Sequence, residues 1–369
     1  MNKLVYTMAL SAMLSTALWV APSFAADVNA GSEGTGEAER AAPGAGATFS
    51  VRDAKPIEVP KLAAGEEPRA APMDEASVVK SLTAVGRSAD GKEVRVEASE
   101  ALREIVKQEL SGGSAGSDSG AGKTSGPGKA VDPAFQEGDR AIFDGDDRVQ
   151  ITNTKAYPFR TIGIILMKAP KSGNTGTCSG TLIGPRTVLT AAHCLYNHDD
   201  GGWLDEFVFV PGLSGATADD APFGGYLYET AYVVEGFITN YQGYYGSVVP
   251  WDLGIITLKD PIGDHLGYLA YNNFDDLADF TANIVGYPGD KPAGTMWRAT
   301  CDVLSENIGI DYFQYKCDTY PGSSGSSVYA VDGNNNRVIV GVNVAESPDA
   351  NTAVRINAGY LEWINGLNK

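Results

Sequence analysis

Short apolar runs separated by turn-forming residues dominate the chain from residue 149 onward. The runs recur about every 10 to 20 residues with Gly, Pro, Asn and Asp between them, which is typical of an all-β sandwich or barrel. A last apolar cluster, Ala358 to Asn365, predicts a closing helix. The runs are Thr161 to Met167, Thr181 to Ile183, Phe207 to Val210, Ala231 to Val234, Leu253 to Leu258, Asn283 to Val285, Gln314 to Lys316, Ser327 to Val331 and Val338 to Val342.

A different pattern precedes residue 111. β-branched residues in Thr48 to Val59 and Ser77 to Val85 favour extended structure, and Val94 to Val96 alternates. Glu97 to Leu110 has apolar residues at the i, i+3 and i+4 spacing of a helix, which a Ser-Gly-Gly stretch ends. Residues 49–110 are therefore predicted to form a small α/β unit. Residues 27–48, before this unit, are rich in Ala, Gly and Glu and have the composition of a disordered segment. Residues 111–130, after it, are rich in Ser and Gly and are interpreted as a flexible linker.

The first 26 residues have the pattern of a secretory signal peptide. Lys3 supplies a positive charge, Leu4 to Val20 is mostly apolar, and Ser23-Phe24-Ala25 fits a small-x-small cleavage site. The chain is therefore expected outside the cell or in the periplasm. No later stretch reaches about 18 apolar residues, so no membrane span is expected after removal of the signal.

Charge and cysteine content narrow the class of protein further. The net charge is −18 at pH 7, whereas nucleic acids and anionic membrane surfaces are bound by basic patches, so neither is an expected partner. The four cysteines all follow residue 177, and an even number in a secreted chain predicts two disulfides, with three possible pairings. No C-x-x-C pair is present and the three histidines are scattered, so no metal site and no cofactor are predicted.

The stretch Asp318 to Val328 has the composition of a nucleophile turn. Gly322 and Gly325 flank Ser324 at a spacing that permits a tight turn, because glycine tolerates positive φ and close approach of a substrate. The backbone N–H groups of Gly322 and Ser324 are the candidates for an oxyanion hole, which stabilises the negative oxygen of acyl transfer. Ser324 is the proposed nucleophile.

Two further stretches supply the partners that a serine nucleophile needs. His193, in Thr-Ala-Ala-His-Cys after an apolar run, is the candidate general base, and Asp252 at the head of an apolar run is the candidate that orients it. The chain order His, Asp, Ser is that of the chymotrypsin-type triad. Asp199, Asp200 and Asp205 are an alternative to Asp252, although their Asp- and Gly-rich setting is typical of a solvated loop.

With these motifs the sequence resembles the trypsin/chymotrypsin-fold serine proteases, and most of all the bacterial glutamyl endopeptidases. The resemblance covers roughly residues 141–369 and is carried by T-A-A-H-C (190–194), W-D-L-G-I-I (251–256), G-Y-P-G-D-K (286–291), C-D-T-Y-P-G-S-S-G-S (317–326) and the segment from Asp146 to Arg160. It implies an all-β fold of two six-stranded antiparallel β-barrels with a C-terminal helix. The triad would lie between the barrels, with Ser324 in the second.

The resemblance also implies how the chain is divided and linked. The mature enzyme would begin near Ala141 after a cut at Arg140-Ala141, so that residues 27–140 form a pro-region and residues 141–369 the protease domain. We expect the disulfide Cys178–Cys194, as in the family, and Cys301–Cys317, which would close a short loop leading into the nucleophile turn.

The specificity pocket departs from the family pattern. Asp318, six residues before Ser324, matches the acid that selects Arg or Lys in trypsin-type enzymes, and Thr319 would line the same pocket. Glutamyl endopeptidases carry a His in the strand that lines the pocket, where this chain has Asn343. Ser323 replaces the Asp that pairs with the new N-terminus in trypsin-like zymogens, so activation must act differently.

These observations predict a monomeric serine endopeptidase, made with a pro-region that assists folding or blocks the cleft, which hydrolyses proteins or peptides after Arg or Lys, or after Glu. The alternative is a catalytically silent protease-fold protein that binds or adheres. An esterase is disfavoured, because α/β-hydrolases have the order Ser, Asp, His.

Overall fold

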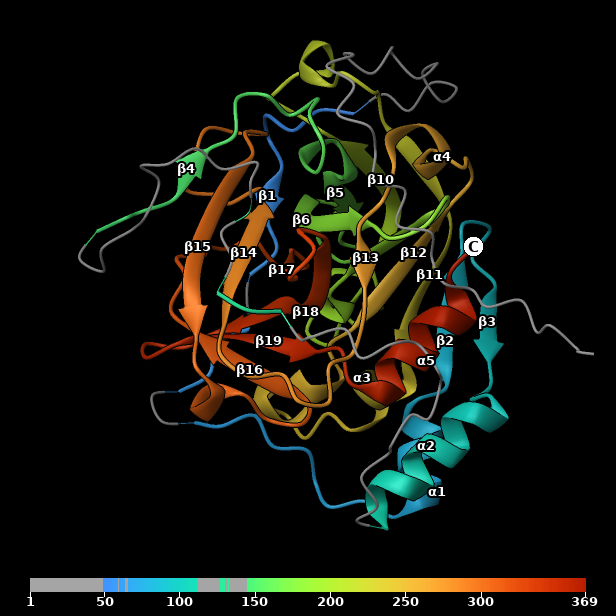
Figure 1. Ribbon diagram of the computed structural model, residues 1–369. Coiled ribbons are helices and arrows are strands. Elements are labelled where there is room, and N and C mark those ends of the chain that lie inside the picture. Colours follow the sequence, from blue (N-terminus) through green and yellow to red (C-terminus); the bar gives the residue numbers. More distant parts are fainter. Residues whose placement is uncertain (1–48, 59, 64–65, 112–126, 130–131, 133–144) are drawn as a thin grey trace, which may run out of the picture. The chain divides into compact units, whose positions relative to one another are not determined.

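The computed structural model describes residues 49–58, 60–63, 66–111, 127–129, 132 and 145–369. The predicted signal peptide and the predicted cut at Arg140-Ala141 lie outside the described residues, as does most of the predicted linker. The first of two large sheets contains a six-stranded antiparallel barrel (Figure 1). Its strands are β5 (Ile162–Lys168), β6 (Thr175–Leu182), β7 (Thr187–Thr190), β10 (Asp205–Pro211), β11 (Tyr226–Val234) and β12 (Gly254–Leu258).

Hydrogen-bonded neighbours follow the order β10-β5-β6-β7-β12-β11, and pairing of β10 with β11 closes this barrel. Its strands are rich in β-branched residues, and β5, β7 and β12 are buried along nearly their whole length. Gly163 in β5 leaves room for a barrel-filling ring, because a methyl group built there would lie 2.5 Å from the Phe209 ring. The barrel is therefore a packed core.

The second sheet places six antiparallel strands in the order β16-β19-β18-β17-β14-β15. They are β14 (Phe280–Gly286), β15 (Trp297–Val303), β16 (Tyr312–Tyr315), β17 (Ser327–Val331), β18 (Arg337–Glu346) and β19 (Asn351–Arg355). The all-β class and the chymotrypsin-like arrangement are confirmed, with one difference. No ladder within the described residues joins β15 to β16, so this unit is a half-barrel. The Cys301–Cys317 disulfide instead links β15 to the segment that follows β16.

Short elements complete this part of the chain. The two-residue strands are β4 (Val149–Gln150), β8 (Tyr196–Asn197), β9 (Gly202–Trp203) and β13 (Ala270–Tyr271). The helices are α3 (Glu235–Thr239), α4 (Gly263–Leu266) and α5 (Ala358–Leu367), and the 3₁₀ turns are η1 (Phe159–Thr161), η2 (Ala192–Cys194), η3 (Ala218–Asp220), η4 (Tyr245–Ser247), η5 (Val249–Trp251) and η6 (Ser305–Asn307). The predicted closing helix is α5, which buries Tyr360, Trp363 and Ile364.

The predicted α/β unit before residue 111 is present, but part of its expected structure is wrong. Ser77 to Val85 divides into the end of α1 (Glu75–Ser81) and the start of β2 (Ala84–Ser88), because the Asp74 side chain caps the helix by accepting from the Ser77 N–H at 2.8 Å. Among the described residues of Thr48 to Val59, which exclude the two end residues, only β1 (Lys55–Pro56) pairs. β3 (Glu93–Val96) and α2 (Glu100–Leu110) lie where alternation and helical spacing predict them.

This unit extends the first barrel. β2 pairs antiparallel with β11 from Ala84 opposite Val234 to Ser88 opposite Thr230, and β3 pairs with β2 (Figure 1). α2 packs against α1 and α5, and Arg95 in β3 donates to the Glu235 carboxylate at 2.6 Å. The unit is therefore held to the barrel by a β ladder, which no local sequence pattern predicts.

Candidate active site

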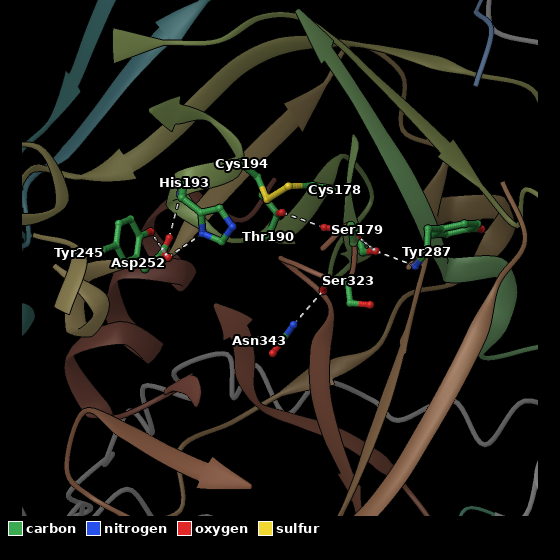
Figure 2. Close-up of a disulfide and its surroundings, with 11 residues drawn as sticks. Cys178, Ser179, Thr190, His193, Cys194, Tyr245, Asp252, Tyr287, Ser323 and Asn343 are labelled. Atoms are coloured by element: carbon green, nitrogen blue, oxygen red, sulfur yellow. Dashed lines mark hydrogen bonds and ion pairs between the residues drawn. A yellow bond between two sulfur atoms is a disulfide. The ribbon is translucent and has the colours of Figure 1, made fainter. Parts of the chain in front are cut away.

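His193 and Asp252 are brought together by two neighbouring strands of the first barrel. β7 leads into η2, which carries His193, and Asp252 precedes β12, which pairs with β7. The His193 Nδ1 atom lies 2.7 Å from Asp252 Oδ2, and the His193 backbone N–H donates to Oδ1 at 2.8 Å (Figure 2). Asp205 instead accepts from Tyr228, so Asp252 is the acid that contacts the histidine.

Tyr245 is a third donor to the Asp252 carboxylate and was not predicted from the sequence. Its hydroxyl donates to Oδ2, the oxygen that also contacts His193 (Figure 2). The Asp252 side chain is fully buried, and a buried carboxylate is stable only when hydrogen bonds replace its lost hydration. Burial and the Asp252 charge raise the pKa of Tyr245 well above its usual value, so the tyrosine is the protonated donor.

The nucleophile turn has the backbone that its glycines predict. Gly322 has φ +101° and Gly325 has φ +81°, values that residues with a Cβ rarely adopt. Ser179, in β6 of the first barrel, holds this turn by two hydrogen bonds. Its N–H donates to the Ser324 carbonyl and its hydroxyl donates to the Gly322 carbonyl, each at 2.8 Å.

Two further donors orient the peptide groups whose N–H atoms would form the oxyanion hole. The Gly289 N–H donates to the Pro321 carbonyl at 2.8 Å, and this carbonyl shares a peptide with the Gly322 N–H. Asn343 Nδ2 donates to the Ser323 carbonyl at 3.2 Å, in the peptide that carries the Ser324 N–H. Neither the Gly322 nor the Ser324 N–H donates to an acceptor in the described part of the chain, so both can receive a ligand oxygen.

Ser324 and His193 are both buried, with 0% and 3% of their surfaces exposed. Among the described residues, neither Ser324 Oγ nor His193 Nε2 has a hydrogen-bond partner. These are the two atoms between which a proton would pass in triad chemistry. The structure therefore joins His193 to Asp252 by hydrogen bonds and leaves the serine hydroxyl unbonded.

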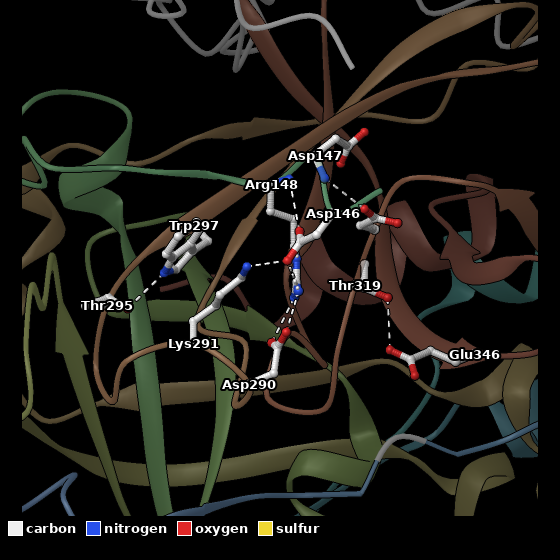
Figure 3. A network of polar contacts seen from close by, with 10 residues as sticks. Asp146, Asp147, Arg148, Asp290, Lys291, Thr295, Trp297, Thr319 and Glu346 are labelled. Atoms are coloured by element: carbon white, nitrogen blue, oxygen red, sulfur yellow. Dashed lines mark hydrogen bonds and ion pairs between the residues drawn. The ribbon is translucent and has the colours of Figure 1, made fainter. Parts of the chain in front are cut away.

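The predicted pocket residues do not all have free polar groups. Asn343 is fully buried, and its Oδ1 accepts from the Tyr315 hydroxyl at 2.5 Å while its Nδ2 contacts the Ser323 carbonyl (Figure 2). Thr319 donates to Glu346 Oε1 at 3.0 Å, and Asp318 Oδ2 accepts from the Asp147 N–H at 3.1 Å (Figure 3). The side-chain atoms of Asn343 therefore hold the nucleophile turn.

Asp147 and Glu346 add two carboxyl groups beside Asp318 and Thr319 that the sequence did not single out. Burial and the nearby Asp318 carboxylate raise the pKa of Asp147 to about 6, and burial raises the pKa of Glu346 above its usual value. Arg148 holds the adjoining segment, because its guanidinium donates to Asp146 at 2.8 Å and to Asp290 at 2.5 Å (Figure 3).

Both expected disulfides are present. Cys178–Cys194 joins β6 to the turn that carries His193, and Cys301–Cys317 joins β15 to the segment that leads to Asp318. Cys178, His193 and Cys194 place potential metal-ligand atoms within 4.8 Å of one another. The two sulfurs are bonded to each other, however, and are not thiolates that could bind a metal.

No helix in the part of the chain that the structure describes is long and apolar enough to cross a membrane.

Known proteins are similar to this chain over the same region. A trypsin-like peptidase domain matches residues 178–342, which include His193, Asp252 and Ser324. A glutamyl endopeptidase of Bacillus licheniformis is 36% identical over 192 residues, which are 52% of this chain and 55% of that protein. A Bacillus subtilis protein named extracellular metalloprotease is 32% identical over 191 residues, which are 51% of this chain and 57% of that protein.

A solved structure of a Glu endopeptidase in complex with MPD superimposes with a TM-score of 0.51 and 28% identity, over 61% of this chain and 98% of that chain. The chain spans a little over half the length of the curated relatives that it matches. The matched domain, the closed barrel beside a half-barrel and the His193–Asp252 contact agree with one another. Residues 178–342 therefore match a trypsin-like peptidase domain, and the chain has a chymotrypsin-like arrangement of strands.

Proposed function

We propose that this protein is a secreted serine endopeptidase that hydrolyses proteins or peptides through an acyl-enzyme. The observation that carries the proposal is the buried His193–Asp252 contact, 2.7 Å long, in a chain whose Gly322–Gly325 turn leaves two N–H groups free.

Each group has a defined role in the proposed reaction. Ser324 Oγ attacks the substrate carbonyl carbon while its proton moves to His193 Nε2, and the carbonyl oxygen becomes negative between the N–H groups of Gly322 and Ser324. His193 then gives that proton to the leaving amine. Asp252 keeps the Nδ1–H directed toward itself and stabilises the imidazolium. Water repeats the sequence to release the acid and restore Ser324.

Labelling by a serine-directed fluorophosphonate tests this proposal. The naturally matured protein should form one covalent adduct, and peptide mapping by mass spectrometry should place the adduct on Ser324 and not on Ser323, Ser326 or Ser327. Protein denatured before labelling is the control and should not react. A folded, matured protein that remains unlabelled would instead support the binding or adhesion alternative.

We further propose that Arg or Lys is the residue cut after. The carboxyl groups of Asp318, Asp147 and Glu346 favour a cation, and Asn343 has no free polar atom for a substrate carboxylate. The second candidate is cutting after Glu, which the names of the glutamyl endopeptidase relatives favour.

Asp318→Asn is expected to lower kcat/KM for Arg and Lys substrates by about 10²-fold, because loss of one partner from a buried charge pair costs about 2–5 kcal/mol. Digestion of a mixed peptide library, with cleavage sites found by mass spectrometry, measures the preference. Asp302→Asn, in an exposed part of β15, is the control. If the wild-type enzyme cleaves after Glu, and Asp318→Asn leaves that cleavage unchanged, the preference for Arg or Lys is rejected. Cleavage after Glu, the second candidate, is then supported.

Tyr245→Phe is expected to lower kcat about tenfold with little change in KM, because hydrogen bonds to charged groups contribute about 1.5–3 kcal/mol. The variant leaves Asp252 with its two His193 donors. Tyr244→Phe is a matched control, since the neighbouring tyrosine is 45% exposed. Equal losses in both variants, or a loss explained by a lower unfolding temperature, would contradict a positioning role for Tyr245.

Asp147→Asn is expected to stabilise the fold at pH 7.5 and to have no effect near pH 4. The raised pKa of Asp147 means that the folded state prefers the protonated acid. The protonated acid adds to the free energy of unfolding below the unfolded-state pKa of about 4, and this contribution is lost as the pH rises through about 6. The loss is about 1 kcal/mol of unfolding free energy after allowance for solvent screening. Urea unfolding at both pH values measures it, and an equal effect at pH 4 would contradict the titration.

Secretion and a zymogen stage are also proposals. The signal-like residues 1–26 and the contacts of residues 49–110 with the protease domain support them. Residues 27–140 would be removed by a cut at Arg140-Ala141, which leaves residues 141–369 as the mature, monomeric enzyme. N-terminal sequencing of the protein from culture medium tests the cut, and a mature N-terminus within residues 49–110 would overturn it.

A further inference from the structure

The described residues of 49–110, with β1, α1, β2, β3 and α2, are called the N-terminal unit, and a short segment of this unit covers the candidate active site. We define the covering segment as residues 55–58 and 60–62, and Val59 lies outside the described residues. The segment pairs with β6 at one end and with the end of β18 at the other, and Ser324 has no exposed surface in the uncut chain. The contacts define both the position and the direction of this segment.

The first contacts are made with β6 and with the turn. β1 runs parallel to β6, with Lys55 opposite Gly176 and Pro56 opposite Thr177, and the Ile57 N–H donates to the Thr177 carbonyl at 3.0 Å. Pro56 also lies against Gly322 of the proposed oxyanion hole and against Gly289, which orients the Gly322 peptide. A methyl group built on Gly289 would lie 2.5 Å from its ring, and one built on Gly322 would lie 3.3 Å from it. Pro56 therefore packs against the Gly322 backbone at the start of the nucleophile turn.

The second contacts are made with the end of β18. The Glu346 N–H donates to the Pro60 carbonyl at 3.1 Å, and the Leu62 N–H donates to the Glu346 carbonyl at 2.8 Å. This is a parallel bridge with Lys61 opposite Glu346. Leu62 is 3% exposed, so its side chain anchors this end of the segment. The covering segment thus runs from β6 toward the end of β18.

The chemistry of acyl transfer sets the direction in which a substrate must run. The acyl half of the substrate stays on Ser324 with its side chain in the pocket, while the leaving amine receives a proton from His193. Thr319 and Glu346 place the pocket at the end of β18, and the Cys178–Cys194 disulfide places β6 on the His193 side. A substrate therefore runs from the end of β18 toward β6.

We propose that the active-site cleft binds the covering segment as a peptide of reversed direction, which blocks the proposed protease without being cut by it. The inference rests on the proposed function and adds the partner that regulates the site. β6 and the end of β18 each offer a free strand edge, and an extended peptide can add to a strand edge in either direction. In the reversed direction no peptide group has both its carbonyl in the oxyanion hole and its nitrogen toward His193.

The sequence of the covering segment contains residues after which the proposed protease could cut. Lys55, Glu58 and Lys61 offer cleavable residues for either proposed specificity. A segment bound in the substrate direction would therefore be cut, whereas a reversed one persists. A cut at Arg140-Ala141 would not release it, since the β2–β11 ladder still holds the N-terminal unit. Inhibition should continue after that cut until the unit itself is degraded.

Fluorophosphonate labelling of the full, uncut chain tests the cover. Ile57→Pro removes the N–H that donates to Thr177 and is expected to speed labelling of Ser324 at least about tenfold. Glu58→Pro is the matched control, because the Glu58 N–H donates to no acceptor among the described residues and proline keeps the preceding residue extended. Its labelling rate should stay within about twofold of wild type.

Mass spectrometry of the wild-type protein tests the direction in which the covering segment is bound. This test needs no variant, so it does not depend on whether a variant folds. After the cut near residue 140, the peptide bonds of residues 55–62 should stay intact while the N-terminal unit is bound, and should be cut once 6 M urea has released the unit and the urea has been diluted. An acyl-enzyme between Ser324 and a residue of the covering segment would overturn the reversed direction.

Failure of this inference differs from failure of the proposed function. If the uncut wild-type chain is labelled as fast as the naturally matured protein, the cover is refuted and the serine protease stands. If no form of the folded protein is labelled at Ser324, the protease itself is refuted. Slow labelling of the uncut wild-type chain and fast labelling of the matured protein support both the cover and the protease. The uncut Ile57→Pro variant should then be labelled at an intermediate rate.

Discussion

Ser324→Ala is expected to lower kcat of the matured enzyme by about 10⁶-fold, as removal of the nucleophile does in other triad proteases. The alanine cannot form an acyl-enzyme, while the oxyanion peptides remain in place because they are oriented by Gly289 and Asn343. KM should change little. Hydrolysis of a peptide substrate identified by the library digest, followed with enough enzyme to detect residual rates, measures the loss.

Ser323→Ala is the matched control for this prediction. Ser323 lies in the same turn, but its contribution there is made by its backbone, whose N–H donates to Tyr320 and whose carbonyl accepts from Asn343. Its kcat should stay within about tenfold of wild type. If Ser323→Ala lost as much activity as Ser324→Ala while both remained folded, the assignment of the nucleophile would be wrong.

Asp252→Asn is expected to lower kcat by about 10⁴-fold with the fold preserved, which is the loss seen when the triad acid is made neutral in a related enzyme type. Asp252 accepts from the His193 backbone, from the imidazole and from Tyr245, and it has no exposed surface. An amide offers only one acceptor atom, and an NH₂ group in the position of Oδ2 faces both the imidazole and Tyr245. The imidazole then takes the tautomer that cannot accept the Ser324 proton.

The pH dependence separates this effect from misfolding. Activity of Asp252→Asn should recover in part at alkaline pH, where hydroxide favours deprotonation of the serine, while its circular dichroism and unfolding temperature stay near those of wild type. Asp205→Asn, which changes an acid bonded to Tyr228 away from the site, is the control. A loss below about 10²-fold in Asp252→Asn would mean that another group orients His193.

Sequence periodicity predicted most of the strands, and it failed where side-chain pattern carries little information. β15 and β19 were not predicted, because polar and charged residues interrupt their apolar positions, as in Trp297–Val303. Ser77–Ser81 contains β-branched residues yet is helical, because it belongs to α1, which begins after the capping residue Asp74. In each case pairing or capping partners decided the element, and local preference did not.

From local motifs alone, the sequence predicted the class of fold and which residues to propose as the reacting groups. The order of His193, Asp252 and Ser324, the glycines that permit the turn and the four cysteines can be read from the sequence directly. The proposed chemistry needs those residue types, so their presence in short motifs predicts it. The all-β class followed from runs of apolar residues between turn signals.

Only the tertiary structure decided which groups support and cover that chemistry. Tyr245 on Asp252, Asn343 on the nucleophile turn and the covering segment on β6 and β18 are contacts between residues far apart in the chain. Nothing in their local sequence marks them, because a tyrosine in a turn, an asparagine in a strand and a Pro-rich stretch are common. Their roles follow from the three-dimensional positions of hydrogen-bond donors and strand edges, which arise only when the barrels have formed.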